Sequence, residues 1–406
     1  MKDSFDRTID YLRISLTDRC NLRCAYCVPK EGVSLCTHGE LLTLEEVWRL
    51  VNIFAGLGIR KIKYTGGEVL LRKNFPYLLK KTIETAGIKD VGITTNGMLL
   101  EEKIPELLSA GLKRVNVSLD TFSADSYEKL TGSRNLTGVL RGIDKACSAG
   151  LKVKINCVPI DGYFDQNDMT SIALLSKDRN IDVRFIELMP IGSAKDYRFK
   201  YSSEQLLSEL EKHFGKSVPV ADVPDPEMTE KKFEKAFYHT PDLTRSFNET
   251  TGEIGQTKER QFDIFGKEEK TGTADRTNSF QETTGEIGKT REQQFDILGE
   301  KSMGSEATVP SVAEYYTFPG FQGKTGFISP RSRIFCSECR RIRLDCRGFL
   351  RLCLSHPDGV DLRSPLREGA TDEELSAIIE KAVLGKPKEH CFSGGTVSDS
   401  MCSIGG

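Results

Sequence analysis

The sequence lacks any long apolar run. No stretch approaches the roughly 18 consecutive apolar residues that a membrane-spanning helix needs. The opening, MKDSFDRTIDYLRISL, has no basic segment followed by an apolar core, as a secretory signal would have. The same opening is too acidic for a mitochondrial transit peptide. These absences predict a cytoplasmic protein without a membrane partner.

The net charge of the chain is also small. Lys and Arg number 57, Asp and Glu number 59, and the formal charge is -2 at pH 7. A chain without excess positive charge is not expected to coat nucleic acid, so no nucleic-acid partner is predicted. Basic side chains can still gather locally where an anion has to be bound.

Cysteine, in contrast, is abundant, with 12 among the 406 residues. A chain of this length buries a core large enough to be stable without disulfides, and a cytoplasmic location opposes them. Tight clusters of cysteine in such a chain point instead to metal ligation.

Short apolar segments alternate with helical patterns over the first 220 residues. Amphipathic stretches such as Leu44–Ala55 begin with a capping box, here Thr43 and Glu46, and Ser202 and Gln205 repeat that pattern. The alternation predicts an α/β fold, an incomplete (βα)6-type barrel whose chemistry lies at the C-terminal ends of parallel strands. The expected strands are Tyr11–Leu16, Ile59–Tyr64, Val91–Thr95, Arg114–Leu119, Val153–Val158 and Val183–Leu188.

Composition divides the chain into three expected parts, a partial barrel over 1–221, an insertion over 222–310 and a C-terminal α+β domain over 311–406. The insertion is polar, and its segment from Ser246, SFNETTGEIGQTKERQFDIFG, recurs in similar form from Ser279. Two copies of a 33-residue repeat cannot stack into a solenoid core, so we expect a flexible insertion. The alternative is a docking segment anchored by Phe262, Ile264, Phe295 and Ile297.

The third part regains a globular pattern. Tyr315–Phe318 and Gly326–Ile328 are predicted strands, and Thr371–Leu384 is a predicted helix with Thr371 and Glu374 as its capping box.

A first cysteine triplet, Cys20, Cys24 and Cys27, follows the first predicted strand with CxxxCxxC spacing. Three thiolates can hold three irons of a 4Fe–4S cluster and leave the fourth iron open, whereas structural zinc takes four protein ligands. S-adenosylmethionine chelates such an open iron. The stretch TGGE, residues 65–68, follows the second strand, where its glycines admit a ligand and Glu68 can pair with a cationic amino group. Zinc remains an alternative for the triplet alone.

A second cysteine triplet, Cys336, Cys339 and Cys353, lies in the third part. It again offers three ligands, although Cys346 could complete a zinc site. Arg341 and Arg343 follow at alternate positions, which places two guanidiniums on one face of an extended segment. Beside a cluster, such a pair is typical of a polyphosphate clamp.

Together these stretches resemble a known family. They are LRISLTDRCNLRCAYC, TGGE, TTNG, VNVSLD, RFIELMPIG, EYYTFPGFQGKTGFIS, FCSECRRIRL and the terminal GG, which cover about residues 8–221 and 312–406. The chain resembles the radical S-adenosylmethionine (SAM) superfamily over residues 1–220, and it closely resembles the GTP 3′,8-cyclases of molybdenum-cofactor biosynthesis over the two ranges that leave out the insertion.

The resemblance implies a radical SAM barrel with a C-terminal iron–sulfur domain, two 4Fe–4S clusters and S-adenosylmethionine as cofactors, and GTP as substrate. The implied lyase reaction removes hydrogen from ribose C3′, joins C3′ to guanine C8, and yields (8S)-3′,8-cyclo-7,8-dihydroguanosine 5′-triphosphate. Implied partners are a cyclic pyranopterin monophosphate synthase that takes the product, a reductant such as flavodoxin or ferredoxin, and a second copy in a homodimer.

The resemblance also assigns residues. The two clusters take the two cysteine triplets named above. Contacts to S-adenosylmethionine fall on Tyr26, Gly67, Ser118 and Met189. Contacts to GTP fall on Arg13, Lys63, Thr94, Lys154, Arg341 and Arg343. The catalytic group is expected to comprise Arg341, Arg343, Gly405 and Gly406, the last two as a flexible tail that enters the site.

The chain departs from the family at three places. Val69 replaces the proline usual after GGE, Arg340 stands for asparagine, and DCR at residues 345–347 replaces a Thr-Ala-Asp run. The departures leave open whether Cys346 affects the second cluster. Two other functions also remain open, a different radical SAM enzyme with an auxiliary cluster, such as a peptide maturase, and an inactive scaffold that binds zinc.

Overall fold

The computed structural model describes residues 1–29, 31–220, 312–392 and 401. These all belong to one of two compact units, Met1–Gly252 with Thr308–Gly406. The repeat segment and the terminal Gly405 and Gly406 lie outside the described residues, so the predictions made for them stay predictions.

Six parallel strands run side by side in chain order, as the sequence predicts. Most of their apolar side chains are fully buried, and these alternate along the strands with polar residues such as Arg13 and Lys63. The strands are β1 (Tyr11–Ser15), β2 (Lys61–Thr65), β3 (Asp90–Thr95), β4 (Arg114–Ser118), β5 (Lys152–Cys157) and β6 (Ile181–Ile186).

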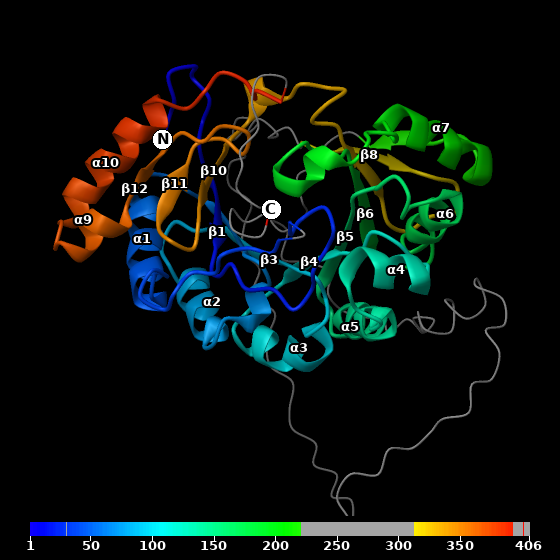
Figure 1. Ribbon diagram of the computed structural model, residues 1–406, viewed down its shortest axis with the longest axis horizontal. Coiled ribbons are helices and arrows are strands. Elements are labelled where there is room, and N and C mark those ends of the chain that lie inside the picture. The colour runs from blue at the N-terminus through cyan, green and yellow to red at the C-terminus, as the bar shows by residue number, and fades with distance from the viewer. Residues whose placement is uncertain (30, 221–311, 393–400, 402–406) are drawn as a thin grey trace, which may run out of the picture. The chain divides into compact units, whose positions relative to one another are not determined.

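Helices follow the strands and lie along the outer side of the curved sheet (Figure 1). Thr43 and Glu46 form both hydrogen bonds of the predicted capping box at the start of the first helix. The box at Ser202 and Gln205 is also present. The helices are α1 (Leu44–Gly56), α2 (Phe75–Ile83), α3 (Leu100–Ser109), α4 (Ala124–Thr131), α5 (Leu136–Ser148), α6 (Gln166–Leu174) and α7 (Ser203–Phe214).

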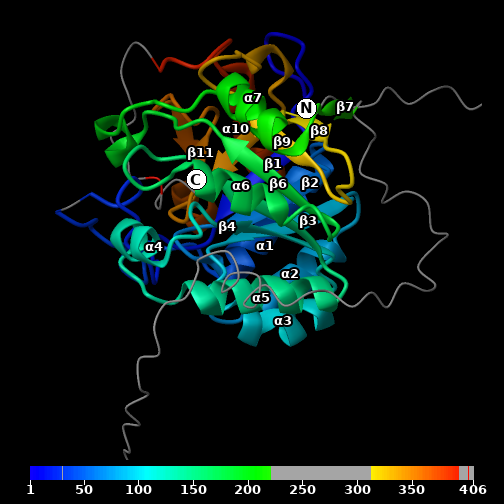
Figure 2. The same cartoon turned by 90° about the vertical axis from the view of Figure 1, so that its right-hand side faces the viewer.

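The C-terminal segment extends this sheet at both edges. At one edge β10 (Arg341–Leu344) pairs in parallel with β1, and β11 (Phe349–Arg351) and β12 (Gly359–Asp361) continue outward. At the other edge β9 (Thr325–Ile328) pairs in parallel with β6; Figure 2 shows these two strands side by side. Beyond β9 lie β8 (Glu314–Thr317) and β7 (Val218–Val220).

Two further helices complete the described C-terminal part, α9 (Arg363–Arg367) and α10 (Asp372–Leu384), the latter with its predicted capping box. Short 3-10 turns occupy η1 (Val69–Leu71), η2 (Gly192–Asp196) and η3 (Cys336–Glu338). Within the described ranges, no helix has both the length and the apolar character to cross a bilayer.

Candidate functional site

A cavity of about 300 Å³ opens at the C-terminal ends of the parallel strands, and both cysteine triplets line it. Nearly all the described residues that the sequence assigns to cofactors or substrate share this lining. They are Arg13, Cys20, Cys24, Tyr26, Cys27, Gly67, Thr94, Ser118, Met189, Cys336, Cys339, Arg341, Arg343 and Cys353. Of the predicted GTP contacts, Lys63 and Lys154 do not line the cavity.

The loop after β1 holds the first triplet through backbone hydrogen bonds. The N–H of Cys27 donates to the carbonyl of Cys24 at 2.9 Å, and the N–H of Ala25 donates to the carbonyl of Leu130, at the end of α4, at 2.8 Å. The side-chain amide of Asn96 approaches Cys20 Sγ at 3.6 Å. The three sulfurs are therefore positioned by residues outside the loop as well as by residues within it.

The TGGE turn packs its backbone directly on this loop. The N–H of Gly67 donates to the Thr17 carbonyl at 2.6 Å, and that of Glu68 donates to the Arg19 carbonyl at 2.7 Å. A Cβ on Gly67 would lie only 2.3 Å from the Arg19 carbonyl oxygen, so glycine is required by this close approach.

Glu68 has a different task from the predicted one. It is buried, and its carboxylate accepts hydrogen bonds from Thr95 Oγ1 at 2.7 Å, the Asn96 N–H at 2.7 Å and the Leu70 N–H at 3.0 Å. Burial raises the pKa of Glu68, while these bonds act in the opposite direction. Glu68 therefore fixes the β3 end of the cavity from behind, and it does not line the cavity itself.

An acidic group lies beside the first triplet. Asp120 lines the cavity and accepts hydrogen bonds from the Tyr26 hydroxyl at 2.9 Å and from the Val158 N–H at 2.8 Å. Burial raises its pKa to about 6, so at neutral pH the carboxylate still carries most of its charge. This end of the cavity therefore favours a cationic ligand group.

Cations surround the second triplet. Lys386 Nζ donates to the carbonyl of Arg341, the first residue of β10, and to the carbonyl of Leu352, directly after β11. Burial opposes ionisation of Cys339, but Lys386 and Arg341 outweigh it and lower the pKa of that thiol to about 7. The N–H of His390 approaches Cys336 Sγ at 3.4 Å. Cys339 is thus close to the thiolate form that iron ligation needs.

The spacing of the sulfurs tests which metal group fits the triplets. Two thiolates on one zinc ion, with Zn–S bonds of about 2.3 Å, lie about 3.8 Å apart. Among the described residues, the only three metal-ligating side chains whose ligand atoms all lie within 4.8 Å of one another belong to neither triplet. In the described conformation neither triplet therefore has all three sulfurs within 4.8 Å of one another.

A row of cations crosses three neighbouring strands. Arg13 on β1 stands in register with Arg343 on β10 and with Lys63 on β2, and residues in register share a face of the sheet. Arg341 lies on the same face of β10, two residues before Arg343. Burial, followed by the charges of Arg13 and Arg341, holds the pKa of Arg343 well below its ordinary value. A polyanion in the cavity would offset this mutual repulsion.

The two lysines predicted to contact GTP sit deeper. Lys63 Nζ donates to Asn116 Oδ1 at 3.2 Å, and Gly92 leaves it room, because a Cβ there would lie 2.7 Å from that nitrogen. Lys154 forms an ion pair with Asp182 at 3.4 Å. Burial, followed by the charge of Arg114, holds the pKa of Lys63 well below its ordinary value, and Asp182 balances the charge of Lys154.

Comparisons with known proteins agree with this geometry. Residues 14–175 match the profile of the radical SAM superfamily, and residues 266–392 match that of Molybdenum Cofactor Synthesis C. A GTP 3′,8-cyclase of Pelotomaculum thermopropionicum is 36% identical over 408 residues, which cover 100% of each chain. Another, of Clostridium perfringens (strain 13 / Type A), is 34% identical over 392 residues, 97% of this chain and 95% of the relative.

The chain belongs to the GTP 3′,8-cyclase family. The predicted radical SAM barrel, the two 4Fe–4S clusters and S-adenosylmethionine follow from that membership. Among solved structures, Streptococcus suis SuiB bound to S-adenosylmethionine has a TM-score of 0.41 and 19% identity, over 51% of this chain and 47% of that chain. A TM-score this low does not bear on function.

The departures from the cyclase family lie outside the cavity lining. Val69 is buried at the start of η1, and Arg340 forms an ion pair with Asp10. Cys346 packs against Cys36, with the two sulfurs 4.0 Å apart. Cys346 thus belongs to a buried cluster with Cys36 and Leu41 and does not line the cavity of the two triplets.

Sequence reasoning missed several polar residues that line the cavity. The family stretches TTNG and VNVSLD contain two of them and could have found them, but the others stand in no motif. The missed residues are Asn96, Asp120, Asn156, Lys386 and His390.

Proposed function

We propose that this chain converts GTP to (8S)-3′,8-cyclo-7,8-dihydroguanosine 5′-triphosphate, an early step of molybdenum-cofactor biosynthesis. The observation that carries the proposal is the single cavity lined by two cysteine triplets with arginines between them. A mononuclear site or a single cluster would not need both triplets, and a peptide substrate would not need buried guanidiniums.

The first triplet would hold one 4Fe–4S cluster, and Tyr26, Gly67, Ser118 and Met189 would line the place of S-adenosylmethionine. When bound, this pair supplies the radical chemistry that removes a hydrogen atom from a carbon of the substrate. Asp120 orients the Tyr26 ring through the hydroxyl hydrogen bond. The backbone of the TGGE turn holds the adjoining loop at a fixed distance.

The second triplet would hold the other cluster and place the purine near it. Arg13, Arg341 and Arg343 would bind the triphosphate, whose charge near −4 needs several cations in a site that is largely shielded from water. Apolar side chains exclude water from the space between the two ends. They include Ile186, Ile328, Phe335 and Leu352.

Finer assignments belong to the same proposal. We infer that flavodoxin or ferredoxin supplies electrons, that a cyclic pyranopterin monophosphate synthase consumes the product, and that the chain forms a homodimer in the cytoplasm. The boundaries 1–221, 222–310 and 311–406 and the entry of Gly405 and Gly406 into the site are likewise proposed.

The deciding experiment uses the full chain, with its clusters reconstituted anaerobically, and GTP deuterated at C3′. The expected products after reduction are the 3′,8-cyclised nucleotide and 5′-deoxyadenosine that carries the deuterium, from protein with about eight irons. Unlabelled deoxyadenosine without a cyclised nucleotide would favour another radical SAM enzyme. Zinc without iron would favour the scaffold.

A further inference from the structure

A second place for a metal lies outside the cavity. Asp18, Cys36 and Cys346 are buried, and one ligand atom from each lies within 4.8 Å of the others. They come from two segments, Asp18 and Cys36 from the long loop between β1 and α1, and Cys346 from the turn between β10 and β11. None of the three lines the cavity of the two triplets.

The sulfur atoms have the spacing of two ligands on one ion. Cys36 Sγ and Cys346 Sγ lie 4.0 Å apart. Thiolates bound to one zinc ion at about 2.3 Å lie about 3.8 Å apart when the geometry is tetrahedral. The pair therefore needs to move only slightly to share an ion.

The third side chain carries an unsatisfied oxygen. Asp18 is 4% exposed, and one carboxylate oxygen accepts the Cys36 N–H at 2.5 Å. The other, Oδ1, is buried and has no hydrogen-bond partner. A buried carboxylate oxygen without a donor is costly, and a cation at this place would remove that cost.

The charges balance around a divalent ion. Arg347 Nε donates to Cys36 Sγ at 2.9 Å and brings one positive charge to the cluster. Two thiolates and one carboxylate bring three negative charges. When the thiolates bind a divalent cation, that cation together with Arg347 neutralises the three charges.

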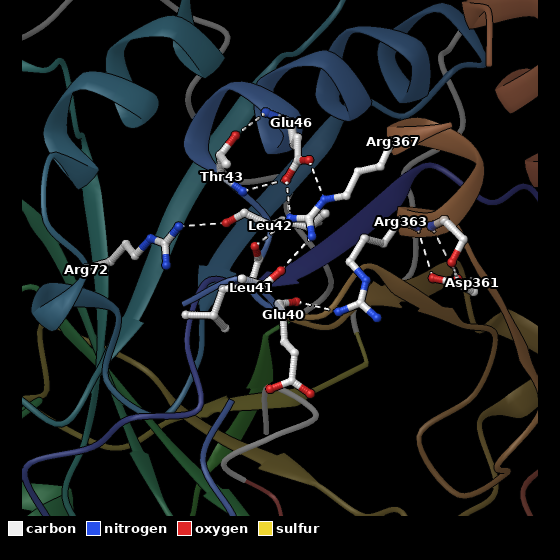
Figure 3. Close-up of polar contacts among 11 residues, drawn as sticks. Glu40, Leu41, Leu42, Thr43, Glu46, Arg72, Asp361, Arg363 and Arg367 are labelled. Carbon is white, nitrogen blue, oxygen red and sulfur yellow. Dashed lines mark hydrogen bonds and ion pairs between the residues drawn. The ribbon is translucent and has the colours of Figure 1, made fainter. Parts of the chain in front are cut away.

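Arginines from other parts of the chain hold the backbone of residues 40–42, which follow Cys36 (Figure 3). Arg72 donates to the Leu42 carbonyl at 2.6 Å, Arg367 to the Leu41 carbonyl at 2.9 Å, and Arg363 to the Glu40 carbonyl at 2.7 Å. The N–H of Leu42 in turn donates to the carbonyl of Cys346 at 3.0 Å. These bonds hold the two cysteine-bearing segments together, as the supporting shell of a metal site does.

We propose that Asp18, Cys36 and Cys346 bind a divalent, borderline-soft cation, with Zn²⁺ as the occupant. Two sulfurs and one oxygen are donors that zinc accepts, and water or the second oxygen of Asp18 completes four-coordination. The ion ties the loop of the first triplet to the β10–β11 turn, which joins the strands between Cys339 and Cys353.

The test measures zinc and iron per chain in full-length protein whose clusters have been reconstituted anaerobically. We expect one zinc beside about eight irons, and X-ray absorption at the zinc edge should show two sulfur neighbours at about 2.3 Å. Cys346→Ala should lose the zinc and keep the iron; alanine is the residue expected there in the family. Cys147→Ala, on α5, is the matched control and should retain both metals.

Asp18→Asn is a second variant for the case in which the cysteine variant folds poorly. It should weaken zinc binding at least about tenfold in competition with a chelating dye, with the iron content unchanged. Three outcomes overturn the proposal: zinc retained in Cys346→Ala, zinc bound by three sulfurs as in a triplet that has lost its cluster, and a Cys36–Cys346 disulfide in native protein alkylated under anaerobic conditions. All three readouts are independent of GTP turnover.

Discussion

The two cysteine triplets face one cavity but stand in opposite electrostatic surroundings. Asp120 and the Tyr26 hydroxyl accompany the first, and Arg341 and Lys386 accompany the second. S-adenosylmethionine is a sulfonium cation, and GTP is a polyanion. The difference shows how one cavity can keep the two ligands at separate ends, because each end attracts one and repels the other.

The triplets also differ in construction. The first lies within eight residues of one loop, which rests on the TGGE turn and the end of α4. The second brackets the β10–β11 hairpin, so its sulfurs depend on strand pairing with β1. A local motif is readable from sequence, whereas the second triplet acquires its partners only when the sheet forms.

The largest effect should come from removing one ligand at each end. Cys24→Ser should lose about four of the eight irons and abolish formation of 5′-deoxyadenosine. Cys339→Ser should also lose about four irons, yet it should still cleave S-adenosylmethionine while making no cyclised nucleotide. Iron analysis and chromatography of both products measure this.

Cys157→Ser, on β5, serves as the control, because Cys157 is buried beside the carbonyl of Asp120 and does not line the cavity. The Cys157 variant should keep its full iron content and form both 5′-deoxyadenosine and the cyclised nucleotide. Equal loss of deoxyadenosine in the Cys24 and Cys339 variants would contradict the division of labour between the two ends.

The next effect concerns the cationic row. Arg343→Ala removes a charge that is in register with Arg13, and a charge-assisted hydrogen bond is worth about 1.5–3 kcal/mol. GTP binding should therefore weaken about 10- to 100-fold, while S-adenosylmethionine binding stays unchanged. Equilibrium binding of each ligand to the reconstituted protein decides it.

Arg351→Ala is the comparison for that variant, because Arg351 stands opposite Arg343 on β11 but does not line the cavity. Its affinity for GTP should stay within about threefold of the original, which corresponds to less than about 0.7 kcal/mol. Equal weakening in both variants would mean that overall charge, and not a clamp, governs binding.

A smaller effect should follow Gly67→Ala. The added Cβ meets the Arg19 carbonyl, so the loop of the first triplet has to shift, at a cost of about 1–3 kcal/mol. S-adenosylmethionine binding should weaken, and GTP binding at the other end should not. Gly56→Ala, at the end of α1 with open space around it, should leave both unchanged. Isothermal titration with each ligand separates the cases.

The six parallel strands were predictable because each is a short segment in which buried apolar residues recur, and this signal is local. Strand pairing was not, since the contacts of β10 with β1 and of β9 with β6 join residues far apart in sequence. The same reason explains the site: Arg13, Arg341 and Arg343 stood in recognisable stretches, whereas Lys386 and His390 reach the cavity from the chain beyond α10 and have no motif.

The type of a side chain also does not show which groups it will contact in the folded protein. Glu68 suggested a contact with a cationic ligand, but its carboxylate accepts hydrogen bonds from Thr95 and Asn96 at the end of the next strand, β3. Cys346 suggested a ligand of the second triplet, but folding brings it to Cys36, more than 300 residues earlier. In both cases the missing information was which residues meet in three dimensions.

The smallest effect tests whether the two ends unfold together. Thr43 caps α1, which follows the loop of the first triplet, and Thr371 caps α10, whose C-terminal end leads to Lys386 at the second triplet, each with a complete capping box. Thr43→Ala and Thr371→Ala should each cost about 1 kcal/mol, because each leaves a helix N–H without its side-chain acceptor. If the continuous sheet makes both ends one cooperative unit, both variants should lower the same calorimetric transition by about 1–2 °C. Iron content should stay constant in both. A transition that only Thr43→Ala lowers, ahead of the main one, would show that the first-triplet end opens alone, and the two ends would then differ in stability as well as in charge.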